Sequence, residues 1–464
     1  MFRNYSHLLL DNPAQLNYGI AVSDLDRDGA FELFVAGFGG ANLVLKWNGE
    51  GFVNIADPTL ADPRRQAIGV AAGDIDGDGG EEIYILNTDT FSGRKQFGDR
   101  LFRYQDGGWI DLCSQAEYRP VLNLTAGRSV VCVDRFGNGR YGFFIANYGG
   151  PMRLYELDKT NGAEKLIDAA PDAGLAAIAG GRGLVSLPLV TPHMDIFAAN
   201  ENGPNFLFCN RGDGTYEETA REAGLSDLRE HGRGVAFLDA DGDGKFDLVY
   251  GNWEGHHRLF LQGATGHFRN VAPEEMARPS RIRTVIAADF DNDGVEELFF
   301  NNIGEPNRLF GLRDGSWRRL DVGEAWEPDG LGTGAAVGDF DGDGQLELLI
   351  SHGESGAQPL SLYRSAPNNN YWLRVLPLTV YGAPARGAVC TLIAGGRRQI
   401  RAIDAGSGYL CQMEPVAHFG LGTYPRVERL EIYWPGGEKV AIDNPTVNQL
   451  IQVPHPSSDS KKMI

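Results

Sequence analysis

Acidic side chains recur in one spacing, Asp-x-Asp-x-Asp-Gly-x-x-(Glu/Asp), at five places in the chain. The copies begin at Asp24, Asp74, Asp239, Asp289 and Asp339. Carboxylates at positions 1, 3, 5 and 9 of such a loop can converge on one cation if the backbone curls tightly. The glycine at position 6 permits that curl because it tolerates positive φ. An oxygen-only, carboxylate-rich shell suits Ca²⁺ better than Zn²⁺ or Cu²⁺, and Mg²⁺ requires stricter octahedral geometry.

The spacing therefore predicts about five Ca²⁺ sites. The expected ligands are Asp24, Asp26, Asp28 and Glu32; Asp74, Asp76, Asp78 and Glu82; Asp239, Asp241, Asp243 and Asp247; Asp289, Asp291, Asp293 and Glu297; and Asp339, Asp341, Asp343 and Glu347. An EF-hand would need a bidentate Glu at position 12, and that position is apolar in every copy, from Val35 to Ile350. The alternative is a turn rich in Asp and Gly that binds nothing. Five intact copies favour the metal site.

The loops repeat at a fixed period, and this period indicates which strands position them. The first aspartates of neighbouring copies lie 50 residues apart, and the gap from Asp74 to Asp239 leaves room for two more units. One of these is degenerate, at 134–139, and the other, at 188–196, has lost the loop chemistry. Each unit carries four short strand patterns, with small apolar residues in the first. Seven such units predict an all-β fold, a seven-bladed β-propeller.

The two ends of the chain complete this arrangement. Residues 1–6 resemble the fourth strand of a unit without its own first three, because Phe2-Arg3-Asn4 matches Phe52-Val53-Asn54. We expect them to close the seventh blade beside 360–363, although Tyr371-Trp372 is an alternative for that place. The predicted domains are the propeller at 1–365, a small C-terminal β-sandwich at 368–455 and a flexible tail at 456–464.

The units resemble the FG-GAP/VCBS repeats of integrin α-subunit propellers and of many secreted bacterial proteins. The C-terminal region resembles the ASPIC/UnbV domain. The segments that match it are Ala405-Gly406-Ser407-Gly408-Tyr409-Leu410, His418-Phe419-Gly420-Leu421-Gly422 and Leu430-Glu431-Ile432-Tyr433-Trp434-Pro435-Gly436-Gly437. The combination resembles the cartilage acidic protein family and its bacterial relatives. This resemblance implies calcium binding through the repeats and an extracellular or periplasmic location.

Composition narrows the class of partner. The net charge is −20, and five loops with four carboxylates each account for that many negative charges. With no basic stripe, nucleic acid is not expected as a partner. No apolar run approaches the length of a transmembrane helix, and Leu8-Leu9-Leu10 is too short for a signal-peptide core. The five cysteines are expected to be free thiols, with a Cys390–Cys411 bridge left open.

A second pattern lies six residues before the first position of the loop. Four consecutive units place an arginine there: Arg128, Arg182, Arg233 and Arg283. In a propeller these guanidiniums would gather at the channel entrance, on the face opposite the metal loops, and could hold an anionic ligand. The alternative is that they pair with local acids and only hold blades together. The insertion 88–99 in the second unit could overhang the same channel.

Two other motifs are better explained without a ligand. Arg211-Gly212-Asp213 falls where other units carry a turn between their third and fourth strands. His256-His257 cannot present both rings to one metal as an i, i+4 helical pair would, so exposed loop residues are expected.

Together these observations predict a calcium-binding, non-enzymatic adhesion or binding protein that acts outside the cytosol. A face of the propeller would recognise a glycan or an extracellular protein. Two alternatives stay open: a propeller lyase or hydrolase that acts on acidic polysaccharide, and a purely structural assembly module. No catalytic residues are assigned, and the oligomeric state is not predicted.

Overall fold

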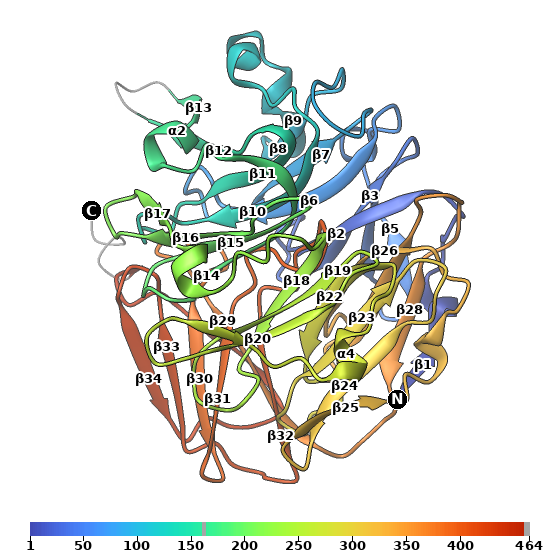
Figure 1. Ribbon diagram of the computed structural model, residues 1–464, viewed down its shortest axis with the longest axis vertical. Coiled ribbons are helices and arrows are strands. Elements are labelled where there is room, and N and C mark those ends of the chain that lie inside the picture. The colour runs from blue at the N-terminus through green and yellow to red at the C-terminus, as the bar shows by residue number, and fades with distance from the viewer. Residues whose placement is uncertain (160–163, 459–464) are drawn as a thin grey trace.

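The computed structural model of the protein describes residues 1–159 and 164–458 (Figure 1). Apart from residues 456–458, the predicted flexible tail therefore lies outside the described residues. Seven antiparallel four-stranded units, called blades 1 to 7 in chain order, are followed by one three-stranded and one four-stranded sheet. This arrangement confirms the predicted fold class, a seven-bladed β-propeller with a C-terminal β-sandwich.

Each blade contributes one strand to each of four positions from the channel outward. The innermost strands are β2 (Asn17–Ser23), β6 (Ala67–Gly73), β10 (Gly127–Val133), β14 (Ile178–Leu187), β18 (Gly232–Leu238), β22 (Ile282–Ala288) and β26 (Gly332–Gly338). The second strands are β3 (Glu32–Gly37), β7 (Glu82–Asn87), β11 (Gly142–Pro151), β15 (Asp195–Asn200), β19 (Asp247–Asn252), β23 (Glu297–Asn302) and β27 (Glu347–His352). The third strands are β4 (Leu43–Trp47), β8 (Arg100–Gln105), β12 (Arg153–Asp158), β16 (Phe206–Asn210), β20 (Arg258–Gln262), β24 (Arg308–Arg313) and β28 (Ser361–Ser365). The outermost strands are β5 (Phe52–Asn54), β9 (Gly108–Asp111), β13 (Lys165–Asp168), β17 (Tyr216–Glu218), β21 (Phe268–Asn270), β25 (Ser316–Leu320) and β1 (Phe2–Asn4).

The first strand of the chain closes the ring. β1 pairs antiparallel with β28, with Phe2 opposite Ser365 and Asn4 opposite Tyr363. Blade 7 is thus built from both ends of the propeller sequence, and the sheet edge at β28 is covered. Tyr371 and Trp372, the alternative for this place, begin a strand of the C-terminal sandwich instead.

Blades 3 and 4 are joined into one sheet. β11 and β14 have ten residues each, and their ends extend past the blades and pair with each other, with Pro151 opposite Ile178. The other described neighbouring blades pack face to face without sharing a sheet. The two blades that lack an intact acidic loop therefore have an additional connection through backbone hydrogen bonds.

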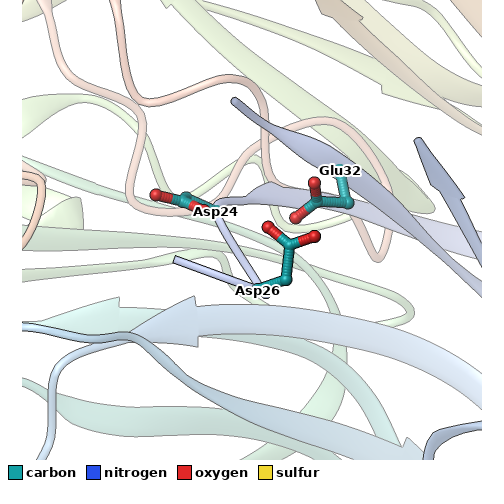
Figure 2. A group of neighbouring side chains, drawn as sticks. All are labelled: Asp24, Asp26 and Glu32. Carbon is teal, nitrogen blue, oxygen red and sulfur yellow. The ribbon is translucent and has the colours of Figure 1, made fainter. Parts of the chain in front are cut away.

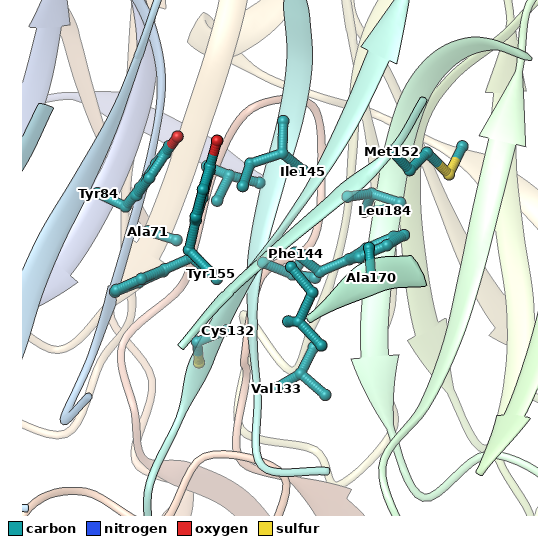
Figure 3. Close-up of a cluster of buried hydrophobic side chains, with 14 of the residues drawn as sticks. Ala71, Tyr84, Cys132, Val133, Phe144, Ile145, Met152, Tyr155, Ala170 and Leu184 are labelled. Carbon is teal, nitrogen blue, oxygen red and sulfur yellow. The ribbon is translucent and has the colours of Figure 1, made fainter. Parts of the chain in front are cut away.

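Apolar side chains fill the space between neighbouring blades. Figure 3 shows one such cluster, in which Tyr84 of blade 2 lies beside Tyr155 of blade 3. Their ring centroids are 5.8 Å apart and the rings are stacked. Because a blade is apolar on both faces, the second strands are almost entirely buried, as their near-continuous runs of Val, Ile, Leu and Phe predict.

Helices are short and lie in the connections. Four-residue helices follow the outer strands of four blades: α1 (Pro58–Ala61), α2 (Ala170–Ala173), α3 (Ala220–Ala223) and α4 (Glu274–Ala277). The 3-10 helices within the described residues include η1 (Ser6–Leu8), η2 (Leu112–Ser114), η3 (Ala116–Val121) and η5 (Glu324–Trp326). Among the described residues, no helix has the length and apolar character needed to cross a membrane.

The C-terminal sandwich consists of two sheets. One contains β29 (Tyr371–Pro377), β32 (Ala417–Gly422) and β35 (Leu450–Val453), and the other contains β30 (Val389–Ala394), β31 (Arg397–Ala402), β33 (Arg429–Tyr433) and β34 (Lys439–Asp443). In Figure 1 the strands of the second sheet lie together on one side of the molecule, orange to red. Cys390 is buried in this sandwich and Cys411 lies outside it; all five cysteines are free thiols.

The connection from β31 to β32, residues 403–416, passes into the centre of the propeller; we call it the channel loop. Its backbone bonds to the innermost strands: Cys132 N–H donates to Ala405 O at 2.8 Å, and Gln412 N–H donates to Ile20 O at 2.8 Å. Gly408 exchanges two hydrogen bonds with Val235. The first of the three ASPIC/UnbV-like segments, residues 405–410, therefore lies in the channel loop, whereas the other two fall in or beside strands of the sandwich.

Close approach in the channel explains the small residues on both sides. A Cβ on Gly19 would lie 2.2 Å from Leu410 O, so no side chain fits there. Gly406 has φ +131°, and a Cβ on it would meet Val131 Cγ1 at 2.4 Å. Glycine is needed at these positions because the loop and the inner strands touch backbone to backbone.

Candidate metal loops and an arginine-lined cavity

The five acidic loops each join the innermost strand of a blade to its second strand. In each loop, three carboxylate oxygens from different residues lie within 4.8 Å of one another. The groups are Asp24, Asp26 and Glu32; Asp74, Asp76 and Asp78; Asp239, Asp241 and Asp247; Asp289, Asp291 and Glu297; and Asp339, Asp341 and Glu347. Figure 2 shows the first group, with the carboxylates of Asp26 and Glu32 turned toward each other. Each group could hold a metal ion.

The predicted ligands are not all brought together equally. Positions 1, 3 and 9 meet in four loops, whereas blade 2 gathers positions 1, 3 and 5 and leaves Glu82 outside the group. In all five loops, including that of blade 2, the position-5 carboxylate accepts a hydrogen bond from the backbone N–H of position 7. These aspartates thus stabilise the turn of the loop.

Backbone N–H groups bind one oxygen of several buried loop carboxylates and leave the other oxygen without a hydrogen bond. In blade 7, Gly344 N–H donates to Asp339 Oδ2 at 2.9 Å, and Phe340 N–H donates to Glu347 Oε2 at 2.8 Å. The other oxygen of each carboxylate is buried and has no hydrogen-bond partner, although Glu347 Oε1 lies 2.9 Å from Arg364 Nε in an ion pair. Asp239 Oδ1, Asp289 Oδ1 and Glu82 Oε1 are likewise buried without a hydrogen-bond partner, whereas Glu32 Oε1 is 3.1 Å from Lys46 Nζ. A buried carboxylate oxygen without a donor is costly, and a bound cation would compensate it.

Burial without such a cation shifts these groups toward the protonated form. Burial raises the pKa of Glu32, Asp74, Asp247, Asp289 and Asp339 to about 7. Burial, followed by the negative charge of Asp291, raises the pKa of Glu297 to about 9. Burial and mutual repulsion thus disfavour the ionised form of these carboxylates, and a bound cation would favour it.

Cations from the third strand lie beside four of the five clusters. Lys46 Nζ is 3.1 Å from Glu32, Arg103 Nε is 3.1 Å from Asp76, Arg313 Nη2 is 3.0 Å from Glu297 and Arg364 Nε is 2.9 Å from Glu347. In blade 5, Leu261 takes the place in the sheet that Arg103 has in blade 2. These side chains neutralise part of the cluster charge and, without an ion, occupy carboxylate oxygens that an ion would need.

In blades 3 and 4, hydrogen bonds and an ion pair within the chain satisfy the acidic side chains near the loop. Asp195 begins β15 as Glu82 begins β7. It accepts hydrogen bonds from the N–H groups of Val190, Thr191 and Asn210, each at 2.8 Å, and from Thr191 Oγ1 at 2.7 Å. In blade 3, Glu156 occupies the place of Arg103 and pairs with the loop residue Arg135 at 2.6 Å, so the charges are reversed. Neither loop gathers three carboxylates among the described residues.

The C-terminal sandwich rests on this end of the propeller and contacts the loops directly. Gly420 N–H donates to Asp289 Oδ2 at 3.0 Å, and Arg374 Nη1 donates to Asp339 Oδ2 at 2.9 Å. Arg374 also binds Glu414 of the channel loop. Asp289 and Asp339, the first-position residues of blades 6 and 7, therefore also form hydrogen bonds between the propeller and the C-terminal domain. The repeat pattern did not indicate these contacts.

At the opposite end, the four predicted arginines meet. Arg128, Arg182, Arg233 and Arg283 line one cavity of about 530 Å³. Tyr409, near the middle of the channel loop, also borders the cavity. The insertion 88–99 reaches the same place, since Phe91 borders the cavity and its carbonyl accepts from Arg128. A buried ion pair between Lys95 and Asp99 anchors this insertion.

The arginines pair only in part with acids. Arg182 and Arg233 share Glu201, and Arg283 Nη2 is 3.0 Å from Glu354. Buried donors without a hydrogen-bond partner remain on Arg128 (Nε), Arg233 (Nε) and Arg283 (Nε and Nη1). Burial, followed by the positive charge of Arg182, lowers the pKa of Arg233 to about 10. The expected local pairing and the expected gathering at the channel mouth thus both occur.

The sequence analysis missed two acidic residues of the cavity and assigned one histidine elsewhere wrongly. Glu201 and Glu354 lie in loops between second and third strands, where no pattern marks them. His257 is buried, contrary to the prediction that it is exposed, because its Nδ1 accepts from Asn252 N–H at 3.1 Å and Nε2 contacts Ser280 Oγ at 3.0 Å. His256 is exposed. Arg211-Gly212-Asp213 forms the turn between β16 and β17.

Comparisons with known proteins fit this architecture. The FG-GAP-like repeat family matches residues 24–85, 192–250 and 239–300, and the ASPIC and UnbV family matches residues 381–460. Cartilage acidic protein 1 of Xenopus tropicalis is 50% identical, over 97% of this chain and 75% of that protein. The Homo sapiens protein of the same name is 48% identical, over 97% of this chain and 73% of that protein. With about half of its residues identical over nearly its whole length, the chain belongs to the cartilage acidic protein 1 family.

Proposed function

We propose that this protein is a calcium-stabilised, non-enzymatic binding protein whose propeller recognises its ligand on the face opposite the metal loops. The observation that carries the calcium assignment is the set of buried carboxylate oxygens without a hydrogen-bond partner in the acidic loops, among them Oδ1 of Asp239, Asp289 and Asp339. Each lies within a cluster of three acidic ligands. An all-oxygen, flexible site of this kind favours Ca²⁺.

The location follows from calcium availability. Extracellular calcium modules bind with Kd of about 10⁻⁴–10⁻³ M, and sites of that strength would be empty in the cytosol. An extracellular or periplasmic location is therefore part of the proposal, and the cartilage proteins among the relatives support it. Calcium would stabilise the propeller because an ion that binds only the folded loops shifts the unfolding equilibrium.

The ligand face is argued from what each end of the ring presents. At the metal-loop end, the C-terminal sandwich contacts the loops of blades 6 and 7. At the other end lies the arginine-lined cavity, bordered by loops that connect second and third strands. A concave site with buried, incompletely paired donors is a better ligand surface than a face covered by another domain. A glycan or an extracellular protein is the proposed ligand.

A glycan and protein array probed in calcium, and again in EGTA, tests this function. We expect saturable binding that requires calcium and is not accompanied by loss of the bound compound. Binding that is equal in EGTA would contradict a role for the metal loops in presenting the face. Calcium-dependent stability with no ligand on either array would favour a purely structural module instead.

A second candidate is a lyase or hydrolase for acidic polysaccharide. Tyr409 is the observation that favours it: although burial opposes ionisation, Arg182, Arg283, Arg233 and Arg128 together lower the pKa of its phenol. A phenol that ionises more readily beside guanidiniums can serve as a base near an anionic sugar. Appearance of shortened or unsaturated oligosaccharides from a polyuronate would establish this activity, and its absence with intact binding would exclude it.

A further inference from the structure

We propose that the arginine-lined cavity is a composite site, completed by Tyr409 of the C-terminal domain, that takes the carboxylate of an acidic sugar such as a uronate. This inference rests on the proposed function, since it names the ligand class of that face. The juxtaposition that carries it is four arginines from four consecutive blades around the tip of the channel loop.

The charge of the cavity fits one anionic group. Its four guanidiniums face three carboxylates, those of Asp89, Glu201 and Glu354, which leaves one net positive charge with Tyr409 neutral. A singly charged carboxylate would balance it. Side chains of Arg233 and Arg283 are more than nine-tenths buried and keep unpartnered nitrogens, so the donors for such a group are already desolvated.

Arg283 has the largest free donor capacity. Its Nε and Nη1 have no hydrogen-bond partner, and its guanidinium lies over the ring of Trp253, 4.1 Å from the centroid. Stacking fixes the plane of the guanidinium. A carboxylate can bind it with two parallel hydrogen bonds through Nη2 together with either Nε or Nη1, once Glu354 has left Nη2. Its one acidic neighbour, Glu354, is 41% exposed, so this pair lies at the opening of the cavity. We infer that Glu354 occupies the position of the ligand carboxylate when no ligand is bound.

Aromatic rings favour a sugar over a simple anion. Tyr18, Phe38, Phe91 and Trp253 border the cavity, and Phe91 is 62% exposed at its rim. Rings of this kind offer flat apolar surfaces for the C–H face of a sugar, while a few polar groups fix its orientation. A volume of about 530 Å³ lies within the range of small-ligand sites and has room for one or two sugar units.

Tyr409 makes the C-terminal domain part of the site. The channel loop is held by hydrogen bonds to Val235 and Val70 on either side of this residue, so the phenol is placed by the propeller itself. The centroid of its ring is 5.8 Å from the Arg283 guanidinium carbon. Removing only the hydroxyl therefore tests the contribution of the loop without disturbing its backbone.

The test is calorimetric titration of the full chain in calcium with a galacturonic acid disaccharide. Galactose disaccharide, a sulfated galactose and a peptide with a free C-terminal carboxylate serve as comparison ligands. We expect saturable binding of the uronate alone. Equal binding of neutral galactose, or preference for the sulfated sugar, would overturn the carboxylate assignment, and preference for the peptide would overturn the sugar assignment.

Three variants and one control locate the binding. Arg283→Gln is expected to weaken uronate binding at least about tenfold, because it removes a charged donor pair. Tyr409→Phe is expected to weaken it about threefold or more. Glu354→Gln is expected to strengthen it about threefold, since the internal competitor is gone. Arg281→Gln, which alters an exposed arginine paired with Glu254 outside the cavity, is expected to change binding less than about twofold.

The same samples separate the two claims. Bound calcium is counted in each preparation before titration. Full calcium occupancy with no uronate binding, or equal losses in Arg283→Gln and Arg281→Gln, would overturn the composite site while the calcium assignment stands. If Arg283→Gln does not fold, the opposite changes expected for Glu354→Gln and Tyr409→Phe decide the question; unchanged affinity in both would overturn it.

Discussion

The loops of blades 4 and 6 join the same two strands of their blades, yet their buried carboxylates differ in how many hydrogen bonds they accept from the chain. In blade 4, Asp195 accepts four hydrogen bonds from the chain. In blade 6, Asp289 Oδ1 has no hydrogen-bond partner and lies in a cluster with Asp291 and Glu297. The chain itself satisfies the carboxylate of Asp195, whereas Asp289 keeps a buried oxygen that a cation could bind. The difference teaches that acidic residues in a repeat indicate a metal only where the chain leaves their oxygens unsatisfied.

The largest expected effect is removal of calcium from the whole chain. EGTA should lower Tm by about 10 °C or more, because each occupied site contributes about 2.7 kcal/mol when calcium is at a hundred times its Kd. Differential scanning calorimetry in calcium and in EGTA measures this, and addition of excess calcium should restore the transition. An unchanged Tm in EGTA would break the distinction between the two kinds of loop.

Asp195→Asn is expected to have the next largest effect. The substitution removes a buried ionic acceptor from three backbone N–H groups and Thr191, at a cost of about 3 kcal/mol in the free energy of unfolding. Because no ion is involved, the loss should be the same in calcium and in EGTA, as measured by urea denaturation. A loss that appears only in calcium would show that blade 4 binds an ion after all.

The sequence predicts the contacts between residues that are close in the chain or equivalent in the repeat, and it does not predict contacts between distant segments. The acidic clusters come from residues within nine positions of each other, and the arginine ring follows from the repeat register, so both could be predicted. The completion of Asp195 by Thr191 was missed because the blade 4 loop lacks the repeat pattern. The path of Tyr409 into the channel was also missed, because it is set by contacts with β6 and β18, strands that lie far from the channel loop in the sequence.

The response to pH sharpens the comparison further. Without calcium, Asp74, Asp247, Asp289 and Asp339 have pKa values of about 7 in the folded protein, above the usual value near 4 in an unfolded chain. Their contribution to stability is therefore present in full below about pH 4 and is lost as pH rises through about 7. In EGTA, Tm should be higher at pH 6 than at pH 8; in calcium, protonation competes with the ion and this gain should disappear or reverse.

The control for that measurement is the double variant Asp289→Asn/Glu297→Gln. It removes two of the raised carboxyls from blade 6, so it should weaken the dependence of Tm on pH in EGTA. A Tm that falls between pH 8 and pH 6 in EGTA, for the unaltered chain, would contradict the raised pKa values.

The smallest expected effect concerns the cations beside the clusters. Lys46→Met removes the ammonium that contacts Asp26, Asp28 and Glu32 in blade 1. Because the ammonium and the calcium ion compete for these carboxylates, the affinity of this one site should rise about two- to fivefold. Calcium titration followed by calorimetry detects the change. Weaker binding would show that Lys46 supports the ion rather than competes with it.

Counting bound calcium tests the central claim most directly. After equilibrium dialysis against calcium, elemental analysis of the unaltered chain should give about five ions per chain, one for each acidic cluster. Asp289→Asn/Glu297→Gln should lose one ion, and Asp195→Asn should lose none. A chain without bound calcium, or equal loss in both variants, would contradict the account.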